Sequence, residues 1–431
     1  MAKNIASQLF EGLSILEKAE LFLIMLMTIA VPIDWRYGVW VLTGLCAVSV
    51  TKMIATRKVG NPALSKIGRA SLVLMMLYFV IYMISIAYSC DRSEGWAEVS
   101  KKLPLLVIPA IVLCSDLSYL KPKHLTALTL LLAGTLTVRF FIMLVGAGIR
   151  YADGAPVAEL IDFHFDPLHH NYLALYLIGA VALLYVQLTR HWKAASWRLM
   201  RWLTVADMGL LTLYMVIMGS RSGLVVMFLL MAACMAHTAF VRKKRKATLI
   251  ILGAFVVFVG ATYLTMPKLY WRIIYSAQQM AEGKRSDSRE VLWLSGIEVL
   301  KGHEAIGLGC GGYWEQLHER YVAHDFAEGY LHEQYSTHNQ YIETALAAGF
   351  VGLAVMLAMI VLPLTEAFSK GRRRNLAMVL FTLVYAGCLL FEDMFARQMG
   401  LLFICWWYCI LLSGNWYQAT DTKVVNGHDS I

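Results

Sequence analysis

Long apolar stretches recur along almost the whole chain, and they constrain its fold more than any other feature of the sequence. Many of them reach the roughly 17–25 residues that an α-helix needs to cross a bilayer. Hydrophobic residues make up 59% of the chain and charged residues 16%, whereas soluble domains contain about 25% charged residues. The stretches lack the alternation of polar and apolar residues that marks a transmembrane β-strand. Because a helix satisfies its own backbone hydrogen bonds in lipid, the sequence predicts an all-α, polytopic membrane protein.

These stretches predict about twelve membrane-spanning helices. The expected positions are residues 20–35, 38–51, 70–90, 103–120, 125–149, 170–189, 203–219, 223–240, 248–265, 340–365, 376–392 and 398–414. One connection, between the ninth and tenth helices, is much longer than the others. The chain is therefore expected to have nine membrane helices within 1–265, a loop domain at 266–339, three further helices within 340–414 and a tail at 415–431.

The positions of lysine and arginine predict which side of the membrane each connection faces. Cytoplasmic connections of membrane proteins are enriched in these residues. With a cytoplasmic N-terminus, the cytoplasmic segments hold 23 of the 38 lysines and arginines, and the short outer loops hold 7. Both termini are therefore expected in the cytoplasm and the loop at 266–339 on the outer face. The net charge of +9 then reflects topology and contact with the lipid bilayer, so no nucleic-acid partner is expected.

The long outer loop is expected to carry function, because long loops without repeats in a compact protein are frequently functional. Its segment "SDSREVLWLSGIEVLKG", residues 286–302, has apolar residues at helical spacing. These residues are Val291, Leu292, Leu294, Ile297 and Leu300. The loop is therefore predicted to fold into short helices that pack on the membrane surface.

Polar side chains at the predicted outer surface are the candidates for chemistry. Charged groups close to the bilayer are costly to place there and are commonly functional. The set comprises Lys101, Lys102, His169, His170, Asn171, Arg221, Arg289, His338, Asn339, Glu392, Asp393, Arg397 and Gln398.

Arg221 and Arg289 are candidates for binding an anion. Arg221 lies in the turn "GSRSG", where small residues let backbone N–H groups approach a phosphate and a guanidinium binds two of its oxygens. A structural interpretation stays open for both residues. Arg221 would then cap the turn or extend toward water, and Arg289 would pair with Asp287 or Glu290 on a solvated helix face.

His338 and Asn339 stand in "STHNQ", at the start of the tenth predicted span. Neutral imidazole, with an ordinary pKa of about 6.5, suits a general base. Ser336 or Thr337 is expected to cap the helix. Asn339 is expected either to orient the imidazole or to cap the helix, and Glu343 to pair elsewhere in the bundle.

No metal and no cofactor are expected. The other histidines of the long loop are His303, His318, His324 and His332. None of them forms the HExxH pattern of a zinc site, and no acidic pair is spaced to hold a divalent cation beside a phosphate. The segment "GLGCGGYWE", residues 307–315, lacks the lysine of a phosphate-binding loop and is interpreted as a flexible turn. Cys90 and Cys310 are placed to meet an oxidising compartment, but a disulfide between them is not favoured.

Taken in order, these motifs resemble those of the bacterial O-antigen ligase and O-antigen polymerase superfamily. The "RSG" turn lies between two spans, the arginine–tryptophan pair and the glycines lie in the outer loop, and "HN" precedes a helix with two glycines. The matching residues are Arg221, Arg289, Trp293, Gly307, Gly309, Gly311, His338, Asn339, Gly349 and Gly352. The resemblance covers mainly residues 203–360 and implies a fold similar to that of glycosyltransferase-C membrane enzymes.

The resemblance also implies a reaction, which is glycosyl transfer at the periplasmic face of the bacterial inner membrane. The donor would be O-antigen polysaccharide on undecaprenyl diphosphate, and the acceptor a sugar hydroxyl of the lipid A–core oligosaccharide. The transfer would proceed with inversion and without metal or nucleotide. Arg221 and Arg289 would bind the diphosphate, and His338 would take the proton of the acceptor hydroxyl. Substrate-binding roles are expected for Asn339, Trp293, Arg139, Lys101, Lys102, Arg397, His169 and His170.

Three other functions stay compatible with the sequence. An O-antigen polymerase and a protein O-oligosaccharyltransferase share the donor and the motifs. A transporter of lipid-linked glycans belongs to a different class, in which internal repeats and helices broken at the midplane are usual. The chain shows no convincing repeat, and its polar residues gather at the outer surface. Its single dominant outer loop resembles that of the ligase more than that of the alternatives.

Overall fold

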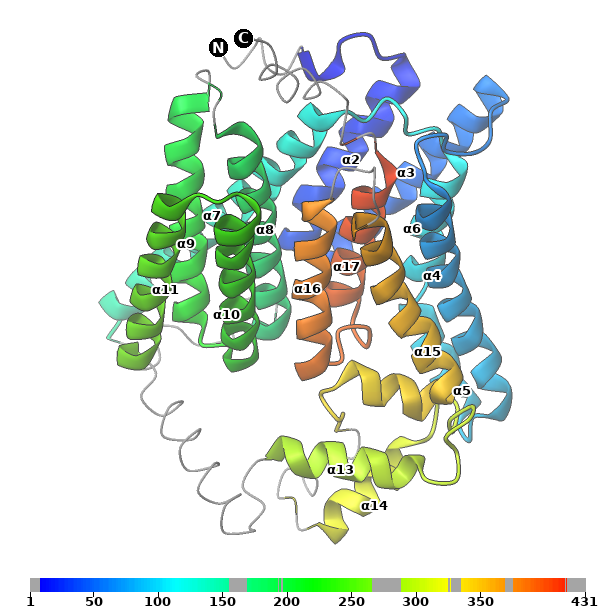
Figure 1. The fold of residues 1–431 in the computed structure, drawn as a ribbon. Helices are drawn as coiled ribbons and strands as arrows, with labels where there is room; N and C mark the ends of the chain where they lie inside the picture. Colours follow the sequence, from blue (N-terminus) through cyan, green and yellow to red (C-terminus); the bar gives the residue numbers. More distant parts are fainter. Residues whose placement is uncertain are drawn as a thin grey trace.

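The protein is a bundle of helices with a smaller helical layer at one end (Figure 1). The computed structural model describes residues 8–154, 169–192, 194, 197–265, 288–324, 326, 335–368, 375–414 and 416. Within these ranges every regular element is a helix. Eight of the helices are long and apolar enough to cross a membrane. The prediction of an all-α, multi-pass membrane protein is therefore confirmed.

The helices follow the predicted order. Those before the long loop are α2 (Ile15–Ile33), α3 (Trp35–Thr56), α4 (Lys66–Ser85), η1 (Ile86–Tyr88), α5 (Arg92–Lys101), α6 (Pro104–Cys114), α7 (Pro122–Ala152), α8 (His170–His191), α9 (Arg198–Met218), α10 (Arg221–Ala236), η5 (His237–Val241) and α11 (Arg245–Thr265). The later ones are α13 (Ser288–Leu300), α14 (Trp314–Ala323), α15 (Gln340–Phe368), α16 (Leu376–Phe391) and α17 (Gln398–Ser413).

Helix α6 is shorter than predicted. The apolar stretch at 103–120 was expected to be one span, but the helix ends at Cys114 and has 11 residues. Such a helix rises about 16 Å, roughly half of the hydrocarbon thickness. The carbonyl groups of Cys114 and Leu113 accept backbone hydrogen bonds from Gly60 (2.7 Å) and Asn61 (3.1 Å), which ties the end of α6 to the α3–α4 connection. The number of twelve spans stays a prediction.

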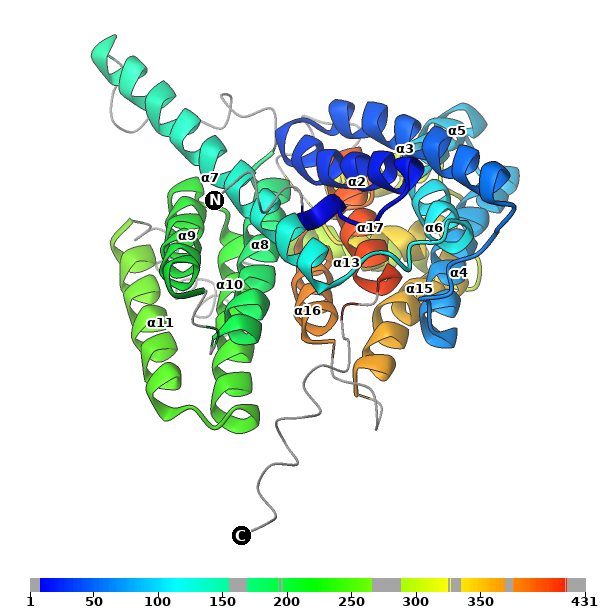
Figure 2. The ribbon, with the colours of Figure 1, turned by 90° about the horizontal axis from the view of Figure 1, so that it is seen from above.

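Helix α8 occupies the centre of the bundle. It contacts α7, α9, α10, α16 and α17, and nearly all of its residues are buried. Seen from above, α9, α10 and α11 lie on one side of α8, and α2, α3, α4, α6 and α15 lie on the other (Figure 2). The C-terminal part of α7 extends away from the bundle (Figure 2). A helix buried on all sides is held in position by its neighbours. The N-terminus of α8 therefore has a defined position relative to the surrounding helices.

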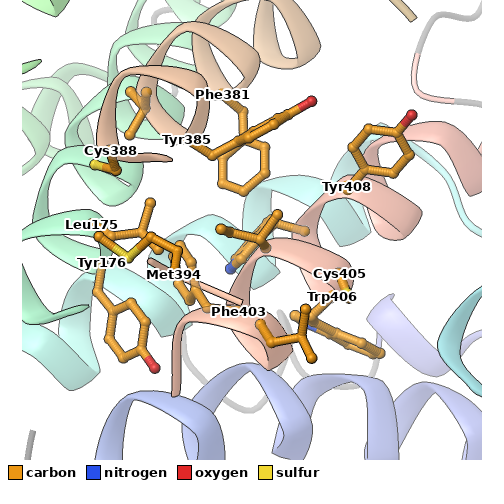
Figure 3. Packing of buried hydrophobic residues seen from close by; sticks show 14 of the residues in the cluster. Leu175, Tyr176, Phe381, Tyr385, Cys388, Met394, Phe403, Cys405, Trp406 and Tyr408 are labelled. Atoms are coloured by element: carbon orange, nitrogen blue, oxygen red, sulfur yellow. The ribbon is translucent and has the colours of Figure 1, made fainter. Parts of the chain in front are cut away.

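Aromatic side chains hold α16 and α17 against α8. The rings of Tyr176 and Phe403 stack with centroids 4.2 Å apart, and Phe381 and Tyr385 lie beside them (Figure 3). Trp406 donates an indole hydrogen bond to the Thr28 hydroxyl at 3.2 Å. Helices in lipid associate through such close packing and polar contacts, since the lipid is as apolar as their side chains.

A break in α15 receives the glycine-rich segment of the loop domain. Gly349 has φ +62°, which interrupts the helix and leaves backbone groups without intrahelical partners. The loop supplies those partners: Phe350 N–H donates to the Glu304 carbonyl at 2.7 Å, and Leu308 N–H donates to the Leu346 carbonyl at 2.7 Å. We call residues 304–312 the glycine wedge. It is closely packed, so the expectation of a flexible turn at 307–315 is wrong for this part.

Helices α13 and α14 form a separate layer at the end of the bundle where α15 begins (Figure 1). The predicted helix in the long loop is confirmed as α13. Gly296 packs closely on α15, since a Cβ added there would lie 2.6 Å from Ile342. Of the predicted apolar positions, Leu292 and Leu300 are buried, whereas Ile297 is exposed.

Candidate active site

The N-terminus of α15 begins with a tightly held turn that presents His338. The residue has φ +49°, a left-handed conformation that is uncommon for a residue with a Cβ. The side-chain oxygen of Asn339 accepts a hydrogen bond from the Tyr341 N–H at 2.9 Å. Asn339 is therefore the cap of this helix, which is one of its two expected roles. The expectation that Ser336 or Thr337 provides the cap is wrong, because Asn339 occupies that position.

Glu343 fixes the same turn from within the protein. Its carboxylate accepts hydrogen bonds from the N–H (2.7 Å) and hydroxyl (2.8 Å) of Thr337 and from the Tyr313 hydroxyl (2.6 Å). Tyr313 directly follows the glycine wedge. The buried carboxylate therefore joins the wedge to the turn that carries His338, and the expectation that it pairs elsewhere in the bundle is wrong.

A loop between α16 and α17 brings a carboxylate to the imidazole. Glu392 Oε1 lies 3.0 Å from His338 Nδ1. The Glu392 side chain is 6% exposed and the His338 side chain 30%. Because an ionised carboxylate can only accept, we assign the proton to Nδ1, which leaves the lone pair of Nε2 for another partner. The ring of Tyr335 packs edge-on against the imidazole, with centroids 5.2 Å apart.

Asp393 completes a pair of neighbouring carboxyl groups with different protonation states. Burial raises the pKa of Asp393 well above its usual value, and the adjacent Glu392 adds to this effect. Burial also acts to raise the pKa of Glu392, but hydrogen bonds with His338 and Asp393 outweigh it and hold that pKa at about 2. Glu392 is therefore the ionised member of the pair and Asp393 the protonated one.

Asn171 connects this carboxylate to the turn before α10. Its amide nitrogen donates to Glu392 Oε2. Its amide oxygen accepts from the hydroxyl groups of Ser220 at 2.9 Å and Ser222 at 3.2 Å. The N-termini of α8, α10 and α15 and the α16–α17 loop therefore meet in one network of hydrogen bonds.

Arg221 is the first residue of α10 and lies between these two serines. The Ser220 hydroxyl caps the helix by accepting from the Gly223 N–H at 3.2 Å. Gly223 lies against α8, where an added Cβ would be 2.7 Å from Ala174. Arg221 itself is exposed. In "GSRSG", small residues thus let α10 approach α8, and the arginine stands at the surface beside the network.

Arg289 reaches the same region from the loop layer. Its guanidinium lies 5.4 Å from the ring centroid of Phe391, the residue that precedes Glu392. Arg289 is also among the charged groups that act on His170, together with His338 and Glu392. The structure therefore brings Arg289, which was predicted from a different part of the sequence, to the Glu392–His338 pair.

His169, His170 and Arg397 surround the cluster from α8 and α17. The rings of His169 and His170 lie 4.1 Å apart. Burial lowers the pKa of His169, with opposing effects from Glu392 and Arg397. These three predicted residues therefore lie within electrostatic range of the Glu392–His338 pair.

The other predicted basic residues make contacts of their own. Lys102 is buried, with Nζ 3.1 Å from Glu98 and 4.8 Å from the ring centroid of Tyr82. Lys101 pairs with the same carboxylate. Arg139 donates to the carbonyl groups at the end of α2, at 2.7 and 2.9 Å. These contacts explain the three residues as structural groups, whereas their predicted roles in binding substrate stay predictions.

Trp293 and the additional histidines lie in the loop layer. Trp293 packs against the core, and within the described part of the chain its indole N–H has no hydrogen-bond partner. His324 pairs with Glu298 at 2.9 Å. His303 and His318 belong to the described loop layer, and His332 lies outside the described residues. Both Cys90 and Cys310 are free, so the unfavoured disulfide is not formed.

His338, Glu392 and Asp393 also have the composition of a metal site. Their ligand atoms lie within 4.8 Å of one another. However, Glu392 already uses one oxygen for His338 and the other for Asn171. The contacts favour a pair that orients the imidazole, and we do not assign a metal centre.

Sequence reasoning recorded Glu392, Asp393 and Asn171 as outer polar residues but gave them no role. Their pairing depends on contacts across 54 residues between His338 and Glu392 and 221 residues between Asn171 and Glu392. The available signal was two adjacent acids in a short connection between apolar helices. Such acids are costly near lipid unless they have partners.

Comparison with known proteins gives one finding. Residues 206–357 match the family described as O-antigen ligase. No curated protein matches the chain. The matched region contains Arg221, Arg289 and His338, whereas Asn171 and Glu392 lie outside it. This part of the chain is therefore similar to the O-antigen ligase family, as the motifs predict.

Proposed function

We propose that the protein is an O-antigen ligase, which transfers polysaccharide from undecaprenyl diphosphate to a sugar hydroxyl of the lipid A–core oligosaccharide. The family match and the membrane helices support an enzyme that acts on lipid-linked glycans. The observation that carries the proposal is the His338–Glu392 pair beside Arg221 and Arg289. It combines a base with two permanent cations at one end of a membrane bundle.

In the proposed reaction, Nε2 of His338 takes the proton of the acceptor hydroxyl. The acceptor oxygen attacks the anomeric carbon from the face opposite the diphosphate, and the bond between that carbon and the phosphate oxygen breaks. The electron pair stays on the departing diphosphate, so the anomeric configuration inverts. General-base catalysis of this kind contributes roughly 10²–10⁴ in rate.

Arg221 and Arg289 would stabilise the charge that develops on the diphosphate. Each preorganised donor at such a charge typically contributes about 2.7–4 kcal/mol. Many transferases use a divalent cation for this purpose, and two guanidinium groups supply the same charge. We therefore propose that the transfer requires no metal.

The proposed setting is the bacterial inner membrane, with the site on the periplasmic side and both termini in the cytoplasm. The clustering of lysine and arginine in the opposite connections supports this orientation. The layer of α13 and α14 would then cover the periplasmic end of the bundle.

The decisive experiment is transfer with purified components, namely lipid-linked polysaccharide, lipid A–core acceptor and the protein in detergent or liposomes. The wild type is expected to form the coupled product, and His338→Ala to lose it while keeping the elution profile of the folded protein. EDTA is expected to leave the activity unchanged. Loss of activity that Mg²⁺ restores would disprove the metal-free mechanism, and absence of product would disprove the ligase.

Gene deletion separates the ligase from the polymerase. Without the ligase, cells keep polymerised glycan on the lipid carrier and have bare core oligosaccharide. Without the polymerase, they attach a single repeat to the core. The proposal predicts the first pattern.

A further inference from the structure

Asn171 lies between the two halves of the site and contacts both. It is the second residue of α8, its burial is nearly complete, and its side-chain amide bonds to three groups from two other segments. We infer that Asn171 is a positioning residue of the transfer reaction, which holds the Glu392–His338 pair in register with the Arg221 turn. This inference rests on the proposed function.

The chemistry of the three partners requires an amide at this position. Glu392 Oε2 is an acceptor and needs a donor, which the amide nitrogen provides. The hydroxyl groups of Ser220 and Ser222 donate, and the amide oxygen accepts from both. Asparagine has a donor and an acceptor in one plane, whereas aspartate has acceptors only and would add a second negative charge beside Glu392.

The serine contacts connect Asn171 to the turn that carries Arg221. Ser220 accepts from the Gly223 N–H and donates to Asn171, so both functions of its hydroxyl are used. Arg221 stands between the two serines, and its backbone is therefore held to the carboxylate that holds His338. A displacement of about 1 Å in such a site can lower the rate roughly 10²-fold.

The charges around this network decide what a pH profile will report. Asp393 lies beside Glu392, Glu343 acts on Asp393, His169 and His170 stand on α8, and Arg289 and Arg397 approach from α13 and α17. The groups that face the Glu392–His338 pair are therefore Glu343, Asp393, His169, His170, Arg289 and Arg397. Arg221 lies next to it on α10. A single substitution at Asn171 removes none of these titratable groups from the protein.

The test compares Asn171→Ala and Asn171→Asp with the wild type. Loss of the amide is expected to lower kcat about 10²-fold, because the two halves of the site are no longer held by a common side chain. In Asn171→Asp, the added negative charge favours the protonated imidazole. The acid limb of the kcat/KM profile is therefore expected to move to higher pH by about one unit.

Asn61→Ala is the matched control. Asn61 is also fully buried and also uses both ends of its amide, donating to the Ser413 carbonyl at 3.1 Å and accepting from the Ala63 N–H at 3.0 Å. It lies in the α3–α4 connection, away from the network. Its replacement is expected to lower thermal stability without the fall in kcat expected for Asn171→Ala. An equal fall in kcat in this control would overturn the inference.

A double substitution tests whether Asn171 acts through Glu392. If it does, most of the effect of Asn171→Ala is already present once Glu392 has been replaced by glutamine. Adding Asn171→Ala to Glu392→Gln should then lower kcat further by less than about 3-fold. Full multiplication of the two single effects would contradict the inference.

A readout without turnover separates this inference from the proposed function. The rate at which diethyl pyrocarbonate modifies His338, followed by peptide mass spectrometry across pH, reports the neutral imidazole. Its midpoint should move to higher pH in Asn171→Asp. An unchanged midpoint in Asn171→Asp overturns the inference. A shifted midpoint in Asn171→Asp supports the inference even if the wild type transfers no glycan, and that absence of transfer overturns the proposed reaction.

Discussion

The two ring nitrogens of His338 have different roles in this structure, since Nδ1 carries the proton and Nε2 the free lone pair. Nδ1 lies 3.0 Å from Glu392, and the imidazole is still 30% exposed. Because Glu392 is ionised and buried, it holds the ring in one orientation and one tautomer. A histidine on a helix end without such a partner would rotate between water and several protein contacts. The carboxylate therefore fixes the direction in which the imidazole points.

Glu392→Gln tests this role, since glutamine keeps the size of the side chain and removes its charge. We expect kcat/KM to fall roughly 10²-fold or more, within the range that general-base catalysis supplies. The acid limb of the pH profile should also move to lower pH, because the anion that favours the imidazolium is gone. The measurement is the pH dependence of transfer. A profile like that of the wild type would show that Glu392 does not act on the base.

Arg221→Lys tests the guanidinium at the surface of the α10 turn. Lysine keeps the charge but cannot bind two phosphate oxygens at once, so transfer is expected to fall by about 10²-fold. Arg36→Lys is the control, because Arg36 is also an exposed arginine near the end of a helix and pairs with Asp34. Initial rates at several donor concentrations give the result. Equal activity of the two variants would remove the diphosphate role of Arg221.

At the scale of elements, the glycine wedge sets where the His338 turn stands. The wedge fills the break in α15 at Gly349. Tyr313, the residue after the wedge, donates to Glu343, which holds Thr337. The spacing of glycines in the loop therefore serves close backbone packing in this structure. No phosphate contact is needed to explain it.

Gly309→Ala is expected to destabilise the protein strongly. Gly309 has φ +93°, and an added Cβ would clash with the backbone and hydroxyl of Ser89. The combined cost of the strained backbone and the overpacking is about 2 kcal/mol or more. Gly302→Ala is the control, because Gly302 has φ +86° with nothing within 4 Å of the added Cβ. The melting temperature in detergent should fall clearly more for Gly309→Ala, and equal values would refute the packing argument.

The elements show how far the sequence alone could predict this molecule. Apolar stretches located the long helices of the bundle, because the length needed to cross a bilayer is a property of each stretch by itself. The end of α6 at Cys114 escaped prediction, since it depends on hydrogen bonds to the distant Gly60 and Asn61. Residue types also indicated Arg289 and His338. The partnership of His338 with Glu392 and of Glu392 with Asn171 arises from tertiary packing, which no local pattern contains.

At the scale of the whole molecule, the candidate site and the loop layer lie at one end of the bundle. The α10 turn, the starts of α8 and α15 and the α16–α17 loop meet there, next to α13 and α14 (Figure 1). The basic α10–α11 connection follows the other end of α10, away from the turn that carries Arg221. A membrane protein with this distribution has its lysine-rich connection in the cytoplasm. The site would then face the periplasm, where a polysaccharide donor already carried across the membrane can reach it.

Cysteine labelling of intact cells tests this orientation. Glu319 on α14 and Lys244 in the α10–α11 connection are both exposed, so a cysteine at either position is open to a thiol reagent. In a Cys90→Ser background, which removes the exposed native thiol, Glu319→Cys should react with a membrane-impermeant maleimide in cells whose outer membrane is permeabilised. Lys244→Cys should react only after the inner membrane is opened. The reverse order would place His338 in the cytoplasm, and the proposed transfer to a periplasmic acceptor would then be impossible whatever the geometry of the site.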